Sequence, residues 1–172
     1  VGKNTGFFYT SADDASTFTS TGVAHGLSTN NTTQACCKYS GGAVFAGSNP
    51  SITAVRVVFT LDGTSFVGGD ITGLGNTSTG VGNQPSHICT GYVDGIETVV
   101  ILGNAAGELF WTQDEGATWH LETYPLGAGI LLSAVAWNGV RFVLGGADGS
   151  SVGYLKHSTD LATWTSATFP AG

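Results

Sequence analysis

The sequence predicts an all-β protein built from repeats. Its 172 residues include 27 Gly and many Thr, Ser and Val, whereas charged residues make up only 10% of the chain. Long amphipathic helices need Glu, Lys and Arg on their wet face, and those residues are scarce here. The other two observations are a pattern that recurs about every fifty residues and tight-turn signals between short apolar runs.

The recurrent pattern is a turn centred on an aspartate. Apolar residues lead into Ser or Thr, an Asp follows two positions later, and Thr or Ser followed by Phe or Trp closes the segment. The four copies are FFYTSADDASTFTSTG from Phe7, VVFTLDGTSFVGGD from Val57, LFWTQDEGATWHLETYP from Leu109 and YLKHSTDLATWTSATFP from Tyr154. Their aspartates lie 49, 52 and 46 residues apart: Asp13, Asp62, Asp114 and Asp160. This spacing indicates a repeated supersecondary unit.

The segments between the Asp turns repeat as well. Each has an apolar run, a tight turn and a second apolar run, which is typical of a β-hairpin. With the strands on either side of the Asp turn, each repeat has four short antiparallel strands, the signature of a β-propeller blade. We therefore expect blades over residues 33–73, 86–125 and 131–170 of one propeller domain. Residues 1–23 would supply two strands of an incomplete first blade, and each Asp turn would join a third strand to a fourth.

The Asp turns are predicted to be structural. An Asp side chain accepts hydrogen bonds from backbone N–H groups just beyond it, glycine supplies a positive φ, and the closing aromatic ring folds back over the turn. The residues expected in this role are Ser11, Asp13, Phe18, Thr60, Asp62, Gly63, Phe66, Thr112, Asp114, Gly116, Thr118, Trp119, Ser158, Asp160, Thr163 and Trp164. Because the aspartates share one position in every repeat, we favour this role over acid/base catalysis or calcium binding.

The four turns resemble the Asp-box, or BNR, motif of sialidase-type β-propellers, Ser/Thr-x-Asp-x-Gly-x-Thr-Trp. TQDEGATW from Thr112 fits every position, STDLATW and TLDGTSF are one residue shorter, and SADDASTF carries Ala15 and Phe18 in place of Gly and Trp. The segments AWNGVRFVLGG and KHSTDLATWT are also similar to repeats in phage tail and bacterial surface propellers. The resemblance implies the propeller fold, but it does not imply one activity, because a fold does not fix function.

No complete catalytic site is expected. The sialidases that the chain resembles hold the substrate carboxylate with three arginines, whereas the chain has only Arg56 and Arg141. Carboxylates that could serve another glycosidase lie in or beside turns, where solvated side chains are common: Glu97, Glu108, Glu115 and Glu122. The histidines lack metal-ligand spacing and no phosphate-binding loop is present, so neither a metal nor a cofactor is predicted.

Charge and composition restrict the partners. A net charge of −7 disfavours binding to nucleic acid, and no apolar run approaches the length that crosses a bilayer. Aromatic residues beside polar ones would suit stacking on sugars, and Trp111, Tyr124 and Tyr154 are the candidates. The alternative, which we favour for any single ring, is packing between blades.

The three cysteines, Cys36, Cys37 and Cys89, are too sparse for a zinc site or a disulfide scaffold. We favour buried thiols over a bridge from Cys36 or Cys37 to Cys89.

The incomplete first blade raises the question of how a ring closes. A propeller ordinarily has at least four blades, and an open set leaves strand edges exposed. The chain begins at Val1 without Met, so we favour a longer polypeptide over neighbouring subunits as the partner that completes the ring.

Three functions remain in competition. The favoured one is a non-catalytic structural or adhesive module of a virion, such as a phage tail or fibre, or of a cell-surface assembly, which recognises proteins or glycans. Its location would be extracellular or virion-associated. The alternatives are a glycan-binding lectin propeller and a fragment of an Asp-box glycoside hydrolase.

Overall fold

The structure is a computed structural model in which strands are the only regular elements of the described residues. It describes residues 9–10, 19–20, 32–49, 54–62, 65–71, 85, 87–103, 107–123 and 125–167. The predicted all-β class is confirmed. Within these ranges there is no helix that could cross a membrane.

The strands form three four-stranded antiparallel sheets and one two-stranded sheet. The first sheet contains β3 (Thr32–Tyr39), β4 (Gly42–Asn49), β5 (Ala54–Thr60) and β6 (Val67–Ile71). The second sheet contains β7 (His87–Val93), β8 (Ile96–Leu102), β9 (Glu108–Thr112) and β10 (His120–Thr123). The third sheet contains β11 (Leu131–Trp137), β12 (Phe142–Ala147), β13 (Gly153–Ser158) and β14 (Thr165–Ser166). The short pair is β1 (Tyr9–Thr10) with β2 (Thr19–Ser20), within the two N-terminal strands expected from the sequence.

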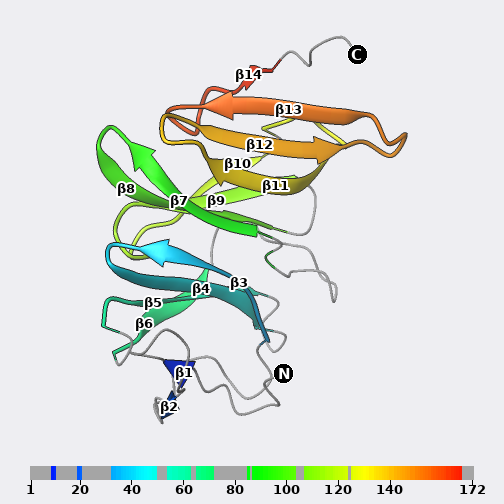
Figure 1. Ribbon diagram of the computed structural model, residues 1–172. Helices are drawn as coiled ribbons and strands as arrows, with labels where there is room; N and C mark the ends of the chain where they lie inside the picture. The colour runs from blue at the N-terminus through cyan, green and yellow to red at the C-terminus, as the bar shows by residue number, and fades with distance from the viewer. Residues whose placement is uncertain are drawn as a thin grey trace.

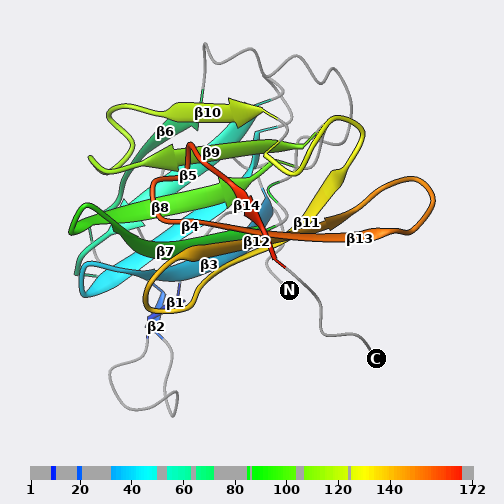
Figure 2. The ribbon, with the colours of Figure 1, turned by 90° about the horizontal axis from the view of Figure 1, so that it is seen from above.

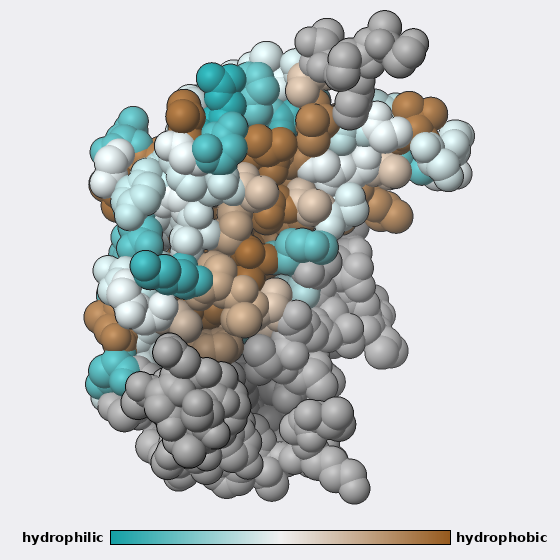
Figure 3. Space-filling model, in the orientation of Figure 1, coloured by the Kyte–Doolittle hydropathy of each residue, from teal (hydrophilic) through white to brown (hydrophobic). Residues whose placement is uncertain are grey.

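The three sheets lie face to face in chain order (Figures 1 and 2). In each sheet the strands follow one another in sequence, and the first strands are neighbours, since β7 contacts both β3 and β11. Figure 3 shows hydrophobic residues gathered in the middle of this view, over β11 and β7. The described sheets form an open stack and do not close into a ring.

Two hairpin turns show why the sequence reverses where it does. Ser40 and Gly41, between β3 and β4, have φ values of 42° and 87°, and Asp94 and Gly95, between β7 and β8, have φ values of 51° and 79°. Two consecutive positive φ values give the turn whose twist matches that of antiparallel strands, and they favour Gly, Asn and Asp. These turns therefore fix the register of the first two strands in the first and second sheets.

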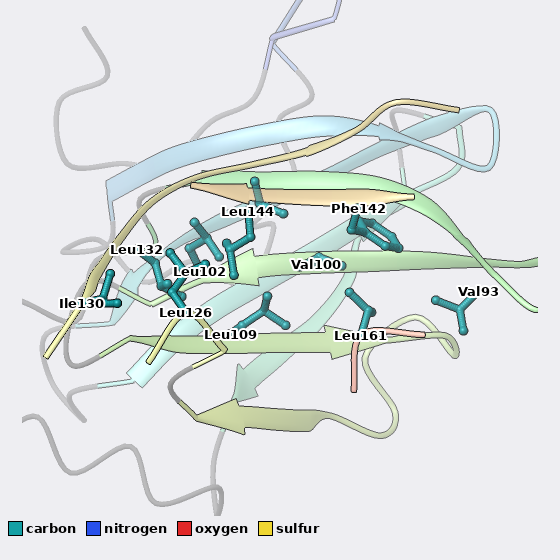
Figure 4. Packing of buried hydrophobic residues seen from close by; sticks show 11 residues of the cluster. Val93, Val100, Leu102, Leu109, Leu126, Ile130, Leu132, Phe142, Leu144 and Leu161 are labelled. Carbon is teal, nitrogen blue, oxygen red and sulfur yellow. The ribbon is translucent and has the colours of Figure 1, made fainter. Parts of the chain in front are cut away.

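Each sheet-to-sheet contact has its own hydrophobic core. Between the first and second sheets, the buried residues are Tyr39, Val44, Ala46, Val55, Val57, Phe59, Ile71, Val99, Ile101 and Phe110. Between the second and third sheets, they are Val93, Val100, Leu102, Leu109, Leu126, Ile130, Leu132, Val135, Phe142, Leu144 and Leu161 (Figure 4). The alternation of strand side chains sends Val99 and Ile101 of β8 to one core, and Val100 and Leu102 to the other. The second sheet is therefore covered on both faces.

Candidate functional site

The Asp turn between β13 and β14 is closed by a network of short hydrogen bonds. The Ser158 hydroxyl donates to Asp160 Oδ1 at 2.8 Å and accepts the Leu161 backbone N–H at 2.8 Å. Asp160 Oδ1 also accepts the backbone N–H of Thr163 at 2.7 Å. The Trp164 indole N–H then donates to the carbonyl of Leu161 at 2.9 Å, so the ring folds back over the turn.

The Asp turn between β9 and β10 repeats this geometry with one residue more. The Thr112 hydroxyl donates to Asp114 Oδ1 at 2.7 Å and accepts the backbone N–H of Gly116 at 3.1 Å. Asp114 Oδ1 accepts the backbone N–H of Thr118 at 2.8 Å. The additional residue is accommodated by positive φ values at Glu115 (57°) and Gly116 (83°).

The Asp turn between β5 and β6 follows the same plan. Thr60 Oγ1 donates to Asp62 Oδ1 at 3.4 Å, which in turn accepts the Ser65 backbone N–H at 2.6 Å. The Ser65 hydroxyl donates to Asp62 Oδ2 at 3.0 Å. All three described turns thus hold the carboxylate with a hydroxyl before it and a backbone N–H after it. The predicted residues Ser11, Asp13, Phe18 and Gly63 lie outside the described residues.

Hydrogen bonding lowers the pKa of two of these carboxyl groups. The backbone N–H of Thr163 is the largest influence on Asp160 and, with the Ser158 hydroxyl, lowers the pKa of that carboxyl. At Asp114 desolvation is the largest single influence and raises the pKa, but the bonds from Thr118 and Thr112 together outweigh it and give a net lowering. A general acid needs a pKa raised toward the working pH, so these carboxylates suit a structural role better than proton transfer.

The Asp turns also join neighbouring sheets. Leu161, with a side chain that is 0% exposed, lies on the second sheet beside Val93, Val100 and Leu109 (Figure 4). In the preceding turn Gly116 approaches the first sheet, and a Cβ added there would lie 3.1 Å from Phe59 Cε2. Both of these turns therefore pack on the sheet before them.

Strand register relates these contacts to one another. Val44 pairs with Phe59, Val100 with Trp111, and Val143 with His157, each one a second-strand residue opposite a third-strand residue. We use "forward face" for the face of a sheet on which these paired residues lie. In the first and second sheets it is the face turned toward the next sheet in the chain. Its corresponding residues are Val44, Ala46, Val57 and Phe59 in the first sheet, Val100, Leu102, Leu109 and Trp111 in the second, and Val143, Gly145, Leu155 and His157 in the third.

The forward face of the third sheet differs from the other two in being uncovered by any described element. The third sheet contacts the second through β11 on its other face. On the forward face, Val143 and Leu155 are only half-buried, and Leu131, at the edge of the same face, is 61% exposed. Arg141 lies next to this face, with its Nη1 3.4 Å from both ring nitrogens of His157. An apolar sheet face with one basic pair is thus available for contact.

A hollow of about 280 Å³ lies between the first sheet and the Asp turn of the second. Its apolar floor is made by Val57 and Phe59, and Trp119 forms one side. Gly69 of β6, which pairs with Val57, leaves the space open, since a Cβ added there would meet nothing within 4 Å. The corresponding residue of the second sheet is Glu122, which pairs with Leu109.

The aromatic candidates for sugar contact lie between sheets or beside a loop. Trp111 is half-buried and packs against the core between the second and third sheets. Its ring stacks on His120 with ring centroids 4.0 Å apart. Tyr154 packs against the same core, and its hydroxyl donates to Asp148 Oδ2 at 3.0 Å, which raises the pKa of Tyr154. Tyr124 lies outside the described residues. The two described candidates, Trp111 and Tyr154, share no ring stack or hydrogen bond with each other.

Other reactive side chains are dispersed. The three cysteines are free, and burial raises the pKa of both Cys37 and Cys89 to about 12, which suppresses the reactive thiolate. Burial also raises the pKa of Glu108, whose side chain lies close to Gly103. In the described part of the chain, no three His, Cys, Asp or Glu side chains gather in a way that could hold a metal ion.

Comparisons with known proteins do not assign the chain. No protein-family model matches it, and no curated protein is similar to it. The hydrogen bonds and packing described above are therefore the basis for a function. Among them, sequence reasoning missed Leu161 as a core residue and Gly69 as the opening of the hollow. The one signal available in the sequence was that an apolar residue, Leu161, directly follows Asp160. In the other turns Gly63 follows Asp62 and Glu115 follows Asp114.

Proposed function

We propose that the protein is a β-propeller module of the Asp-box kind with a structural or adhesive role in an extracellular or virion-associated assembly. The observation that carries this proposal is the forward face of the third sheet, which no described element covers. The same face of the first and second sheets is buried by the sheet that follows. A repeat architecture buries its faces by stacking, so a further sheet is expected there.

The partner surface can be described from the two contacts that are present. In both, a four-stranded sheet places its Asp turn on the third strand of the sheet before it, as Leu161 does beside Leu109. A sheet that covers Val143 and Leu155 would bury apolar surface that is otherwise open to solvent. Such a sheet can come from further residues of the same polypeptide, which we favour, or from a neighbouring subunit.

Several observations favour a structural or adhesive role over the two alternatives. A lectin propeller would have equivalent pockets at each sheet-to-sheet contact, but Leu161 fills the place between the second and third sheets that corresponds to the hollow. A glycosidase needs two facing carboxylates, and the Asp-box carboxylates of the described turns are engaged in hydrogen bonds. The low proportion of charged residues, together with the resemblance of two sequence segments to phage tail and surface repeats, favours an exterior assembly.

Mass measurement on the protein isolated from its source tests this proposal. We expect intact and native masses that reveal either a polypeptide well above 17.5 kDa or an oligomer of such chains. Leu155→Asp should disrupt the assembled form by placing a charge on the forward face, whereas Leu61→Asp, at an exposed leucine in the β5–β6 turn, should not. A stable 17.5 kDa monomer in the native source would contradict the proposal.

A further inference from the structure

The hollow between the first and second sheets combines an apolar floor with one aromatic side. Val57 and Phe59 on the floor are only 1% and 2% exposed, so the apolar surface that a ligand can reach is provided by Val67, which is 62% exposed. Trp119 lines the side. Tyr39 is outside the lining and packs edge-on against Phe59 with ring centroids 5.2 Å apart. A space of about 280 Å³ is close to the lower limit of small-ligand pockets, so it suits one compact group rather than an extended molecule.

The charged residues at the hollow are acidic. Asp114 and Glu115 line it, and the described lining contains no Lys or Arg. Glu97 lies nearby on the second sheet and accepts the Ser40 backbone N–H at 3.1 Å. Burial, followed by the fields of Glu115, Glu97 and Asp114, raises the pKa of Tyr39. Negative potential therefore reaches the hollow from the second sheet.

We propose that this hollow binds a compact organic cation, a quaternary ammonium or alkylammonium group with an apolar body. The apolar part would contact Val67, which pairs with Phe59. The positive charge would lie near the Trp119 ring, and Asp114 and Glu115 would attract it. An anion would be repelled, and a neutral ligand would gain from apolar contact alone. This inference goes beyond the structural role proposed above and does not depend on the forward face of the third sheet.

A pair of isosteric probes tests the charge requirement on the full chain. Choline carries the positive charge, and 3,3-dimethylbutan-1-ol has the same shape without it. We expect choline to shift the Trp119 indole N–H signal in ¹H–¹⁵N spectra, assigned with Trp119→Phe, and to saturate in the millimolar range typical of so small a ligand. The neutral probe should bind at least about tenfold more weakly, because it lacks the cation–π and Coulomb attraction.

Two variants test the location. Gly69→Val should fill the hollow and weaken choline binding at least about tenfold. The control Gly153→Val adds the same side chain at an exposed glycine of β13 where an added Cβ also meets nothing within 4 Å, and it should bind as wild type does. Glu115→Gln should weaken choline binding by severalfold while leaving the neutral probe unchanged.

The result that overturns the proposal is equal binding of the two probes, or choline binding that Gly69→Val and Glu115→Gln leave intact. Stronger binding of methyl glucoside than of choline would also overturn it, because the hollow would then recognise a neutral sugar ring. These outcomes are separate from the mass measurement, so failure of either proposal leaves the other standing.

Discussion

The contact between the first and second sheets and the contact between the second and third are built from the same turn but are packed differently. In the later contact, Leu161 enters the core directly after Asp160 and is fully buried. In the earlier one, Glu115 has the corresponding place and is exposed, and Gly116 approaches Phe59 instead. One additional residue in the turn thus replaces a buried side chain by bare backbone, and a hollow lies beside it.

The comparison shows how one type of Asp turn can serve two purposes. Leu161 has a φ of 62°, a conformation that costs an L-residue about 1 kcal/mol. Burying a leucine side chain returns about 1.5–3 kcal/mol, so packing outweighs the backbone strain. At Gly116 the same left-handed region has no steric cost, but it also provides no side chain for the core. The contact between the second and third sheets is therefore filled by a side chain, whereas the contact between the first and second sheets leaves a hollow.

The largest effect on this comparison is expected from Leu161→Ala. The change removes a fully buried side chain from the second core and should lower the free energy of unfolding by about 3 kcal/mol. Urea unfolding followed by tryptophan fluorescence measures it. The matched control is Leu155→Ala on the uncovered forward face, where a half-buried leucine should cost under about 1 kcal/mol. Equal losses at the two positions would show that Leu161 has no special part in the contact.

A smaller loss is expected from Gly116→Ala. The added methyl group would lie 3.1 Å from Phe59 and 3.2 Å from the Trp119 indole nitrogen, on a backbone with φ of 83°. We expect a loss of about 1–2 kcal/mol, visible as a lower midpoint in the same unfolding experiment. Gly149→Ala, at an exposed glycine with nothing within 4 Å of an added Cβ, is the control and should be close to neutral. A neutral Gly116→Ala would show that the approach to Phe59 is loose.

The smallest effect concerns the charge of the Asp turns. Asp160→Asn should lower the free energy of unfolding by about 1 kcal/mol at pH 7, since it replaces a charged acceptor of local backbone N–H groups by a neutral one. The folded-state pKa of Asp160 lies below its ordinary value, so the stabilisation is present above the unfolded pKa and is lost as the pH falls through the folded value. The difference between wild type and variant should therefore shrink below about pH 4, near the ordinary Asp pKa.

The corresponding Asp114→Asn change should have a weaker pH dependence, because desolvation opposes the hydrogen bonds there. Unfolding curves collected from pH 7 to pH 3 measure both variants. A difference that stays constant with pH would mean that the charge of Asp160 does not contribute.

Much of the fold was accessible from the sequence because turn chemistry is local. Gly41 and Gly95 mark hairpins through positive φ, and Thr112 and Asp114 mark an Asp turn because a hydroxyl and a carboxylate two residues apart satisfy each other. Alternating apolar residues then define four strands per repeat. The candidate surfaces could not be predicted in the same way. Gly69 is only a glycine in a strand until the positions of its partner Val57 and of the Asp turn of the second sheet are known.

By itself, the sequence determined the all-β class, the antiparallel strand order within each repeat and the hydrogen bonds of the Asp turns, because these depend on residues a few positions apart. Only the tertiary structure decided which turn residue enters a core, where a hollow is left, and which sheet face is uncovered. Those features depend on the distance between sheets and on residues far apart in the sequence, such as Phe59 and Gly116, which are 57 positions apart. No local pattern encodes such a contact, because packing is decided jointly by both surfaces.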